Sequence, residues 1–210
     1  MRRYNTIIFD FDGTLVNSDT LIESTFIKLK DELGLQDISL KKIKSFKHLS
    51  LKDKIKLFNI SPLKLPKIIK RVQEEMGNNL NMISWNPGII SLLEKLSKEQ
   101  YQLGVLSSNS TKNLNAFFSA SQISRFEFVK SGNNLFGKDK DLKKLIKEQK
   151  LIKENILYVG DEVRDIEACQ KIGVDIAAVS WGFEEKELLN KHNPTYLVND
   201  PKELLKIISG

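Results

Sequence analysis

The sequence has a single cysteine, two histidines and no long apolar run. Cys169 has no second cysteine with which to form an intrachain disulfide, which favours a reducing compartment. The apolar runs are only a few residues long, whereas a membrane-spanning helix needs about 20. The first run, residues 7–9, meets Asp10 at once and is too short for the apolar part of a secretory signal. We therefore expect a cytoplasmic protein with no membrane partner.

Acidic residues are scarce between residues 41 and 56. One acid, Asp53, stands there among seven lysines: Lys41, Lys42, Lys44, Lys47, Lys52, Lys54 and Lys56. Such a stretch can bind nucleic acid, attract a small anion or form a solvated helix face. Aromatic residues do not alternate with these lysines as a base-stacking surface requires. We expect no nucleic-acid partner, and both other interpretations stay open.

Short apolar runs alternate with helical periodicity through most of the chain. The runs rich in β-branched and aromatic residues predict strands at 6–9, 101–106, 126–129, 156–159, 174–179 and 195–198. Strands that alternate with helices form a parallel sheet covered by helices on both faces. The pattern predicts an α/β fold with a Rossmann-like parallel sheet. Ligands bind such sheets beyond the carboxyl ends of the strands.

Residues 16–84 break this alternation. Apolar residues recur there at helical spacing in three groups: Ile22, Phe26, Leu29 and Leu33; Ile55, Leu57, Phe58 and Ile60; and Ile68, Ile69, Val72 and Met76. This predicts an inserted all-helical cap domain over 16–84 and an α/β catalytic core made of 1–15 and 85–210. Because the insertion begins near the end of the first strand, we expect it to lie over the ligand end of the sheet.

Two carboxylates follow the first predicted strand, and two more follow the strand at 156–159. Asp10 and Asp12, two positions apart on an extended chain, point to the same side. Asp161 and Asp165 follow the other strand, and if the two strands are neighbours all four acids converge. Buried carboxylates need a cation or another partner. A cluster of oxygen ligands without histidine or cysteine suits Mg²⁺ better than zinc.

Hydroxyl, amide and ammonium groups are expected at the same sheet edge. Ser107, Ser108 and Asn109 follow the strand at 101–106, and Lys138 can add a positive charge. Each signal is weak by itself, since such residues are common in turns. Together, in this order and each beyond a predicted strand, they describe a phosphate-binding site.

The order of these motifs resembles the haloacid dehalogenase superfamily. The residues that carry the resemblance are Asp10-Phe11-Asp12-Gly13-Thr14, then Ser107, then Lys138, then Gly160-Asp161-Glu162-Val163-Arg164-Asp165. The helical insertion stands where that family has its C1 cap, and the chain is most similar to the phosphoglycolate-phosphatase-like branch. The resemblance implies a Mg²⁺-dependent phosphatase acting on a small phosphate monoester, with a phosphoglycolate-like substrate as the first choice.

The resemblance also implies a role for each residue. Asp10 would be the nucleophile that forms an aspartyl-phosphate, and Asp12 the general acid and base. Ser107 and Lys138 would contact the transferring phosphoryl group. Further phosphate or substrate contacts are expected from Gly13, Thr14, Ser108, Asn109 and Lys47. The expected Mg²⁺ ligands are Asp10, the Asp12 carbonyl, Asp161 and Asp165.

Several alternatives remain open at this point. Ser108 could replace Ser107, and Lys140 could replace Lys138. A sugar-phosphate mutase would carry the same aspartates, and a catalytically silent binding module would use the same scaffold. A P-loop nucleotide site is not indicated, because the Gly-x-x-x-x-Gly-Lys-Ser/Thr pattern does not occur. We expect a monomer whose partner is a small anionic phosphorylated substrate.

Overall fold

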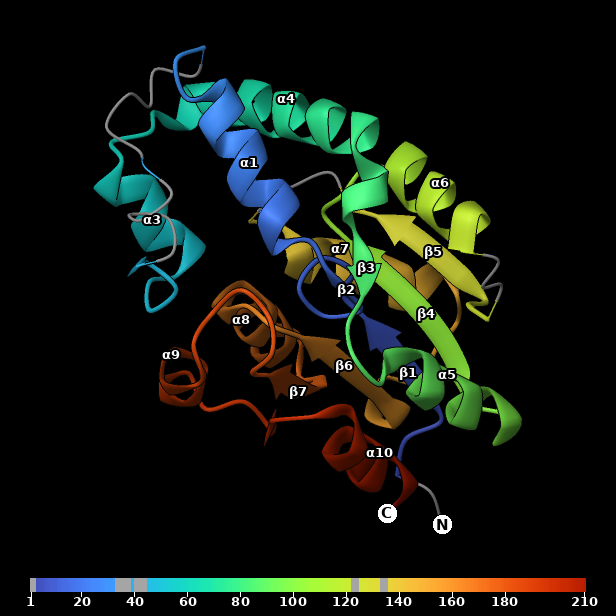
Figure 1. Cartoon of the computed structure of the whole chain (residues 1–210). Coiled ribbons are helices and arrows are strands. Elements are labelled where there is room, and N and C mark those ends of the chain that lie inside the picture. The colour runs from blue at the N-terminus through green and yellow to red at the C-terminus, as the bar shows by residue number, and fades with distance from the viewer. Residues whose placement is uncertain (1–2, 33–38, 40–44, 122–124, 133–135) are drawn as a thin grey trace.

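The computed structural model of the chain describes residues 3–32, 39, 45–121, 125–132 and 136–210 (Figure 1). Its centre is a parallel sheet of six strands in the order β5-β4-β1-β6-β7-β8. The strands are β1 (Thr6–Phe9), β4 (Gln102–Ser107), β5 (Phe128–Ser131), β6 (Ile156–Gly160), β7 (Asp175–Val179) and β8 (Tyr196–Val198). The predicted α/β fold with a parallel sheet is confirmed. The strand predicted at 126–129 lies two residues further along the chain.

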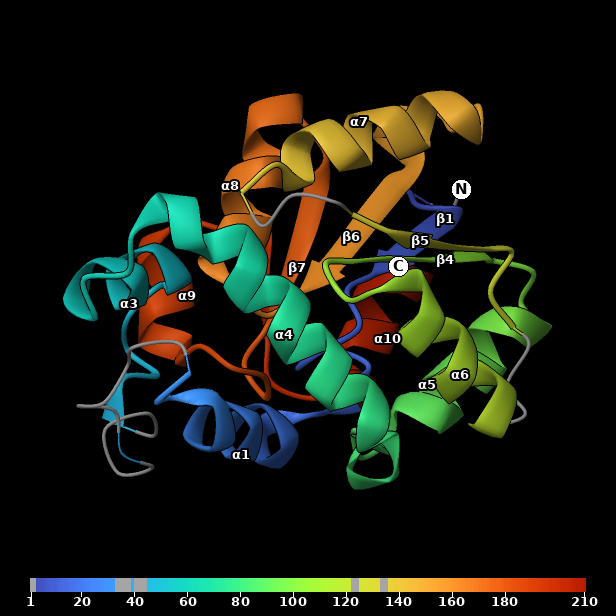
Figure 2. The same cartoon turned by 90° about the horizontal axis from the view of Figure 1, so that it is seen from above.

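Helices cover both faces of the sheet (Figure 2). One face packs on α5 (Ile89–Lys98), α6 (Thr111–Ser121) and α10 (Pro201–Ser209). The other packs on α7 (Lys138–Glu148), α8 (Val163–Ile172) and α9 (Lys186–Lys191). Because side chains alternate along a strand, Ile7 and Phe9 enter the first core and Ile8 the second. Both cores are built from strands whose residues are buried on either side, which explains their continuous apolar runs.

Helix α8 begins directly beyond β6 and has well-defined ends. Glu162 and Asp165 form a capping box, in which each side chain accepts a hydrogen bond from the backbone N–H of the other. Gly173 ends the helix in the left-handed conformation, with φ of 70°. The capping box fixes the first turn of α8 directly after the end of β6, where the predicted acids lie.

The segment 18–83 is mainly helical in its described residues, which lie beyond the carboxyl ends of the strands (Figure 1). It contains α1 (Asp19–Leu29), α3 (Leu51–Leu57), α4 (Leu65–Asn78) and two 3₁₀ turns (Pro62–Lys64 and Leu80–Met82). Leu29 and Ile68 form a small apolar cluster of its own there, with Phe26, Phe58 and Val72 packed against them. The cap domain at 16–84 stays a prediction, and its Leu33, Lys41, Lys42 and Lys44 lie outside the described residues.

A two-stranded antiparallel ribbon joins this segment to the sheet. Strand β2 (Val16–Asn17) pairs with β3 (Ser84–Trp85), Val16 opposite Trp85. The prediction that 16–84 has only helices is therefore wrong at its two ends. Strands of two residues carry no periodicity that a sequence pattern could reveal. Within the described ranges, no helix combines the length and the apolar character needed to cross a membrane.

Candidate active site

Asp10 stands at the end of β1 with its carboxylate held from two sides. Its Oδ1 accepts a hydrogen bond from the backbone N–H of Phe11 at 2.7 Å, and its Oδ2 accepts one from Lys138 Nζ at 2.6 Å. The side chain is 2% exposed. Burial raises the pKa of Asp10 to about 6, although the Lys138 charge opposes that shift. The result is a carboxylate with one fixed cation and a defined orientation.

Lys138 is the first residue of α7 and reaches back into the sheet edge. Its ammonium lies between Asp10 and Asp165 and forms a hydrogen bond to each. Burial lowers the pKa of Lys138, but the two carboxylates outweigh burial and hold that pKa above its usual range. Lys140, the alternative left open by the sequence, is exposed and does not have this position. The geometry therefore favours Lys138.

Asp12 lies in the loop after β1, where two side chains donate hydrogen bonds to it. Ser18 Oγ donates to Oδ1 at 2.8 Å, and Asn109 Nδ2 donates to Oδ2 at 2.9 Å. Burial raises the pKa of Asp12, and both of these hydrogen bonds oppose the rise. The raised pKa favours the protonated form that a general acid needs. Asn109, which the sequence predicted as a phosphate contact, thus donates a hydrogen bond to the predicted acid and base in this structure.

Gly13 and Thr14 pack directly against Asp161. A Cβ on Gly13 would lie 2.2 Å from Asp161 Oδ2, and φ at Gly13 is 78°, so only glycine fits here. Thr14 Oγ1 donates to Asp161 Oδ1 at 2.7 Å, and the N–H of Phe183 donates to Oδ2 at 2.8 Å. Burial and the nearby charge of Glu162 raise the pKa of Asp161 well above its usual range. Thr14, predicted as a phosphate contact, therefore orients the Asp161 carboxyl group in this structure.

Three acids at this edge are close enough together to bind one metal ion. Ligand oxygens of Asp10, Glu162 and Asp165 all lie within 4.8 Å of one another, and all three residues are buried. Buried carboxylates with only oxygen donors fit Mg²⁺. Asp161, also predicted as a ligand, does not belong to this group of three. The Asp12 ligand was predicted to be its main-chain carbonyl, which stays a prediction. Glu162 was part of the recognised motif, but no role for it was predicted.

Ser107 ends β4 and Ser108 follows it, and their hydroxyl groups have different partners. The Ser107 hydroxyl oxygen accepts a hydrogen bond from the N–H of Asn109 at 3.0 Å, and the residue is 2% exposed. Ser108 Oγ accepts one from Arg164 Nη2 at 3.2 Å. Arg164 also pairs with Glu162. Burial lowers the pKa of Arg164, but the charges of Glu162, Asp165 and Asp10 outweigh burial and hold that pKa above its usual range. The first turn of α8 therefore contributes a cation that the sequence analysis did not single out.

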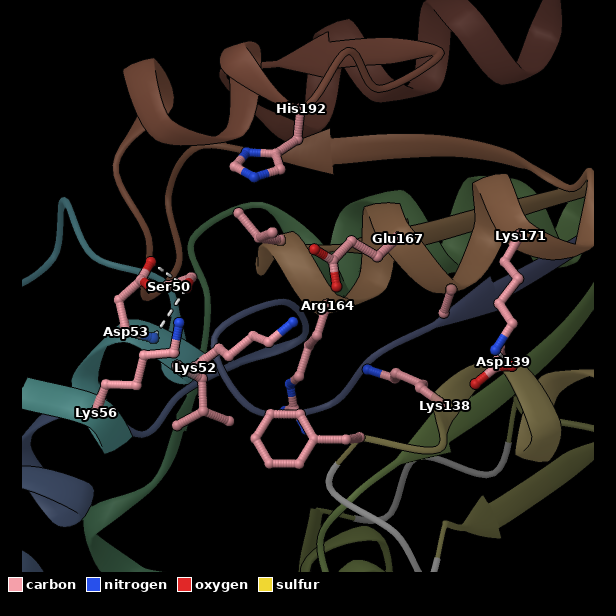
Figure 3. Close-up of a pocket in the computed structure, with 14 residues that line it drawn as sticks. Ser50, Lys52, Asp53, Lys56, Lys138, Asp139, Arg164, Glu167, Lys171 and His192 are labelled. Carbon is pink, nitrogen blue, oxygen red and sulfur yellow. Dashed lines mark hydrogen bonds and ion pairs between the residues drawn. The ribbon is translucent and has the colours of Figure 1, made fainter. Parts of the chain in front are cut away.

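A cavity of about 460 Å³ adjoins these residues (Figure 3). Lys138 and Arg164 extend into it from one side and Lys52 of α3 from the other. The full lining is Ser50, Leu51, Lys52, Asp53, Lys56, Phe136, Lys138, Asp139, Val163, Arg164, Glu167, Ala168, Lys171 and His192. Lys47, the lysine predicted to contact the substrate, is absent from this lining and donates to Asp19 at 2.7 Å. Lys52 and Lys56 are better placed for that contact.

Comparison with known proteins identifies the family of this chain. Residues 7–179 match the family of haloacid dehalogenase-like hydrolases. The chain belongs to that family. It is 31% identical over 204 residues to the phosphoglycolate phosphatase of Synechococcus elongatus, covering 97% of this chain and 96% of that protein. It is 28% identical over 209 residues to the pyrophosphatase PpaX of Oceanobacillus iheyensis, covering 97% of this chain and 96% of that protein.

Solved structures of this hydrolase family have the same fold along the whole chain. A haloacid dehalogenase-like protein from Streptococcus pneumoniae superposes with a TM-score of 0.81 at 25% identity, covering 97% of this chain and 98% of the other. A predicted phosphatase from Clostridium acetobutylicum gives a TM-score of 0.83 at 21% identity, covering 98% of each chain. The resemblance inferred from the motifs, and the expectation of a hydrolase, are both confirmed.

Proposed function

We propose that this protein is a Mg²⁺-dependent phosphatase that hydrolyses a small anionic phosphate monoester through an aspartyl-phosphate on Asp10. The observation that carries the proposal is the buried Asp10 carboxylate, held 2.6 Å from the Lys138 ammonium beside a cation-lined cavity. The similarity to a phosphoglycolate phosphatase supports a phosphoglycolate-like substrate as the first choice. We propose that the enzyme acts as a monomer.

In the first step, a carboxylate oxygen of Asp10 attacks phosphorus and the bond to the leaving oxygen breaks. Asp12 protonates that oxygen, which the raised pKa of Asp12 favours. In the second step, Asp12 takes a proton from water, and the water oxygen attacks phosphorus. The bond between phosphorus and Asp10 then breaks and releases inorganic phosphate. The Phe11 N–H and the Lys138 ammonium hold Asp10 in one orientation throughout.

The phosphoryl oxygens need positive or donating groups around them. Lys138 supplies a fixed ammonium next to the nucleophile, and Ser107 supplies a hydroxyl at the end of β4. The Arg164 guanidinium, adjoining Ser108, faces the cavity that would hold the leaving group. Residues 16–84 would form the cap that excludes water from this space, which strengthens each of these interactions.

Asp10, Glu162 and Asp165 would hold the Mg²⁺ ion. Asp161, a further predicted ligand, is close enough that, besides burial, the charges of these three acids raise its pKa. When bound, the ion neutralises charge on the phosphate and on the attacking carboxylate. The Lys138 ammonium already neutralises part of the charge on Asp10 and Asp165.

A panel of substrates tests the proposal: phosphoglycolate, pyrophosphate, a sugar phosphate, a nucleotide and an aryl phosphate, each with Mg²⁺ and with chelator. We expect release of inorganic phosphate with Mg²⁺ only, fastest with phosphoglycolate. Pyrophosphate belongs in the panel because one relative is a pyrophosphatase. Phosphate release that persists in chelator would rule out the Mg²⁺ requirement, and no release from any member would rule out the phosphatase.

A further inference from the structure

Glu184 is a buried acid that lies outside the predicted catalytic set. It follows the loop after β7 and is 1% exposed. Its Oε2 accepts a hydrogen bond from the backbone N–H of Val163 at 2.6 Å. Its Oε1 accepts one from the backbone N–H of Leu51 at 3.1 Å. One side chain therefore contacts two segments that are far apart in the sequence.

Each of these two contacts reaches the first residue of a helix. Val163 begins α8, whose first turn carries Arg164 and Asp165. Leu51 begins α3, which carries Lys52 and Lys56. Since the first N–H groups of a helix have no partner within the helix, a side-chain acceptor is the usual way to satisfy them. Glu184 satisfies one such donor on each side of the cavity.

Among the residues that the structure describes, few other contacts hold α3 against the sheet. None of the residues of α3 is buried, so apolar packing contributes little to its position. A second hydrogen bond runs alongside, from the N–H of Glu185 to the carbonyl oxygen of Lys47 at 3.1 Å. The position of α3 therefore depends on polar contacts with the short segment Glu184–Glu185.

We propose that Glu184 is a positioning residue that fixes α3 against the start of α8, so that Lys52 faces Lys138 and Arg164 across the cavity. It touches neither the phosphoryl group nor the leaving group and acts through the two helix starts. The effect on catalysis rests on the proposed function, because it assumes that the leaving group occupies the cavity. The contact between Glu184 and α3 does not depend on the proposed function.

Glu184→Gln is the first test, because glutamine has nearly the same shape. Its amide nitrogen cannot accept a hydrogen bond, so one of the two N–H groups loses its partner. We expect KM for phosphoglycolate to rise about tenfold, the effect of losing one such hydrogen bond. The kcat for an aryl phosphate should change by less than about twofold, a difference too small to reflect a lost hydrogen bond. The matched control is Glu187→Gln, an exposed acid three residues further on, which should leave both values unchanged.

Leu51→Pro tests the same contact from the other side and leaves Glu184 intact. Proline removes the N–H but fits the first position of a helix. Ser50, with φ of −63° and ψ of 158°, has the extended backbone that a residue before proline adopts. Leu51→Ala removes the same side chain and keeps the N–H. We expect the rise in KM with proline to exceed the rise with alanine by at least about threefold.

Amide hydrogen exchange tests the contact without any substrate. The Leu51 N–H has no partner within α3, so its protection should depend on Glu184. In Glu184→Gln, exchange at Leu51 or Val163 should be at least about tenfold faster, with β1 unchanged. Equal exchange at both residues in wild type and variant would overturn the proposal, as would an unchanged KM in a wild type active on phosphoglycolate. Faster exchange in a protein that hydrolyses no monoester would support the contact and reject the phosphatase.

Discussion

Lys138 lies between two buried carboxylates, and this arrangement determines what the loss of its charge would cost. Asp10 and Asp165 both bond to the same ammonium, and all three side chains are at most 6% exposed. Without that ammonium, two like charges would remain close together in a medium that solvates them poorly. Breaking a buried ion pair in this way usually costs more than the pair contributes to stability.

Lys138→Met should therefore lower the free energy of unfolding by about 3–5 kcal/mol without Mg²⁺. Added Mg²⁺ should reduce this loss, because a bound cation replaces the missing charge between the acids. Urea unfolding with and without Mg²⁺ measures both effects. The control, Lys140→Met, changes an exposed lysine two residues away and should stay within about 0.5 kcal/mol of wild type. Equal losses for the two variants would contradict the assignment of Lys138.

Asp10→Asn should reduce phosphatase turnover to less than about a hundredth of wild type, because an amide cannot attack phosphorus as a carboxylate does. The fold should persist, since Asn Oδ1 can still accept the Phe11 N–H. Steady-state phosphate release, with circular dichroism as the check on folding, measures this. Turnover near the wild-type rate in a folded variant would show that another group attacks phosphorus.

Among the elements, α3 carries three lysines with different surroundings. Lys52 and Lys56 line the cavity, whereas Lys54 does not. A cation–anion pair at about 4 Å is worth about 4 kcal/mol at an effective dielectric constant of 20, but only about 1 kcal/mol in open water. A lysine facing the leaving group should therefore matter more than one facing solvent.

Lys52→Ala should lower kcat/KM for phosphoglycolate by about tenfold, with a smaller loss for an aryl phosphate whose leaving group carries less charge. Lys64→Ala removes the same charge from an exposed position in a nearby 3₁₀ turn and should have little effect on either substrate. Lys47→Ala is the third variant. Lys47 was predicted from the sequence to contact the substrate, but its ammonium pairs with Asp19. Equal small losses for all three variants would show that the basic stretch is a solvated surface.

The helices and strands of the core could largely be predicted from the sequence, because burial on one or both faces leaves a regular apolar pattern. The six predicted strands are found within two residues of their predicted ends. The site was predicted only in part. Glu184 could not be identified, since its partners are backbone N–H groups, and any residue except proline supplies one. Glu162 and Arg164 stood in a recognised motif, but side-chain direction within the first turn of α8 is not visible in spacing alone.

At the scale of the whole molecule, the proposed Mg²⁺ site would make the stability of the protein depend on Mg²⁺. Burial raises the pKa of both Asp10 and Asp161, and a cation bound beside them would favour their ionised forms. A ligand that binds only the folded state stabilises it by about 2.7 kcal/mol at one hundred times its Kd. The same acids thus link metal binding to the fold.

Millimolar Mg²⁺ should raise the Tm of the wild type by several degrees, since about 1 kcal/mol moves the Tm of a chain of this size by about 2–4 °C. Chelator should reverse the change. Asp161→Ala should raise the Mg²⁺ concentration needed for half-maximal activity by about tenfold or more, as expected for an altered metal site. A Tm that is the same with Mg²⁺ and with chelator would contradict a metal site among these acids.

The ribbon of β2 and β3 brings the two ends of the inserted segment 18–83 to adjacent positions. Asn17 lies opposite Ser84, and directly opposed residues of antiparallel strands have Cα atoms about 4.5–5.5 Å apart. A two-residue turn such as Asn-Gly spans that gap, so residues 18–83 could be exchanged for a hairpin turn without stretching the sheet. A chain shortened in this way would keep Asp10, Lys138 and Asp165 but lose Ser18 and α3. Transplanting the corresponding segment of a relative onto the same two strands would then change the choice of substrate while the chemistry stays with the sheet.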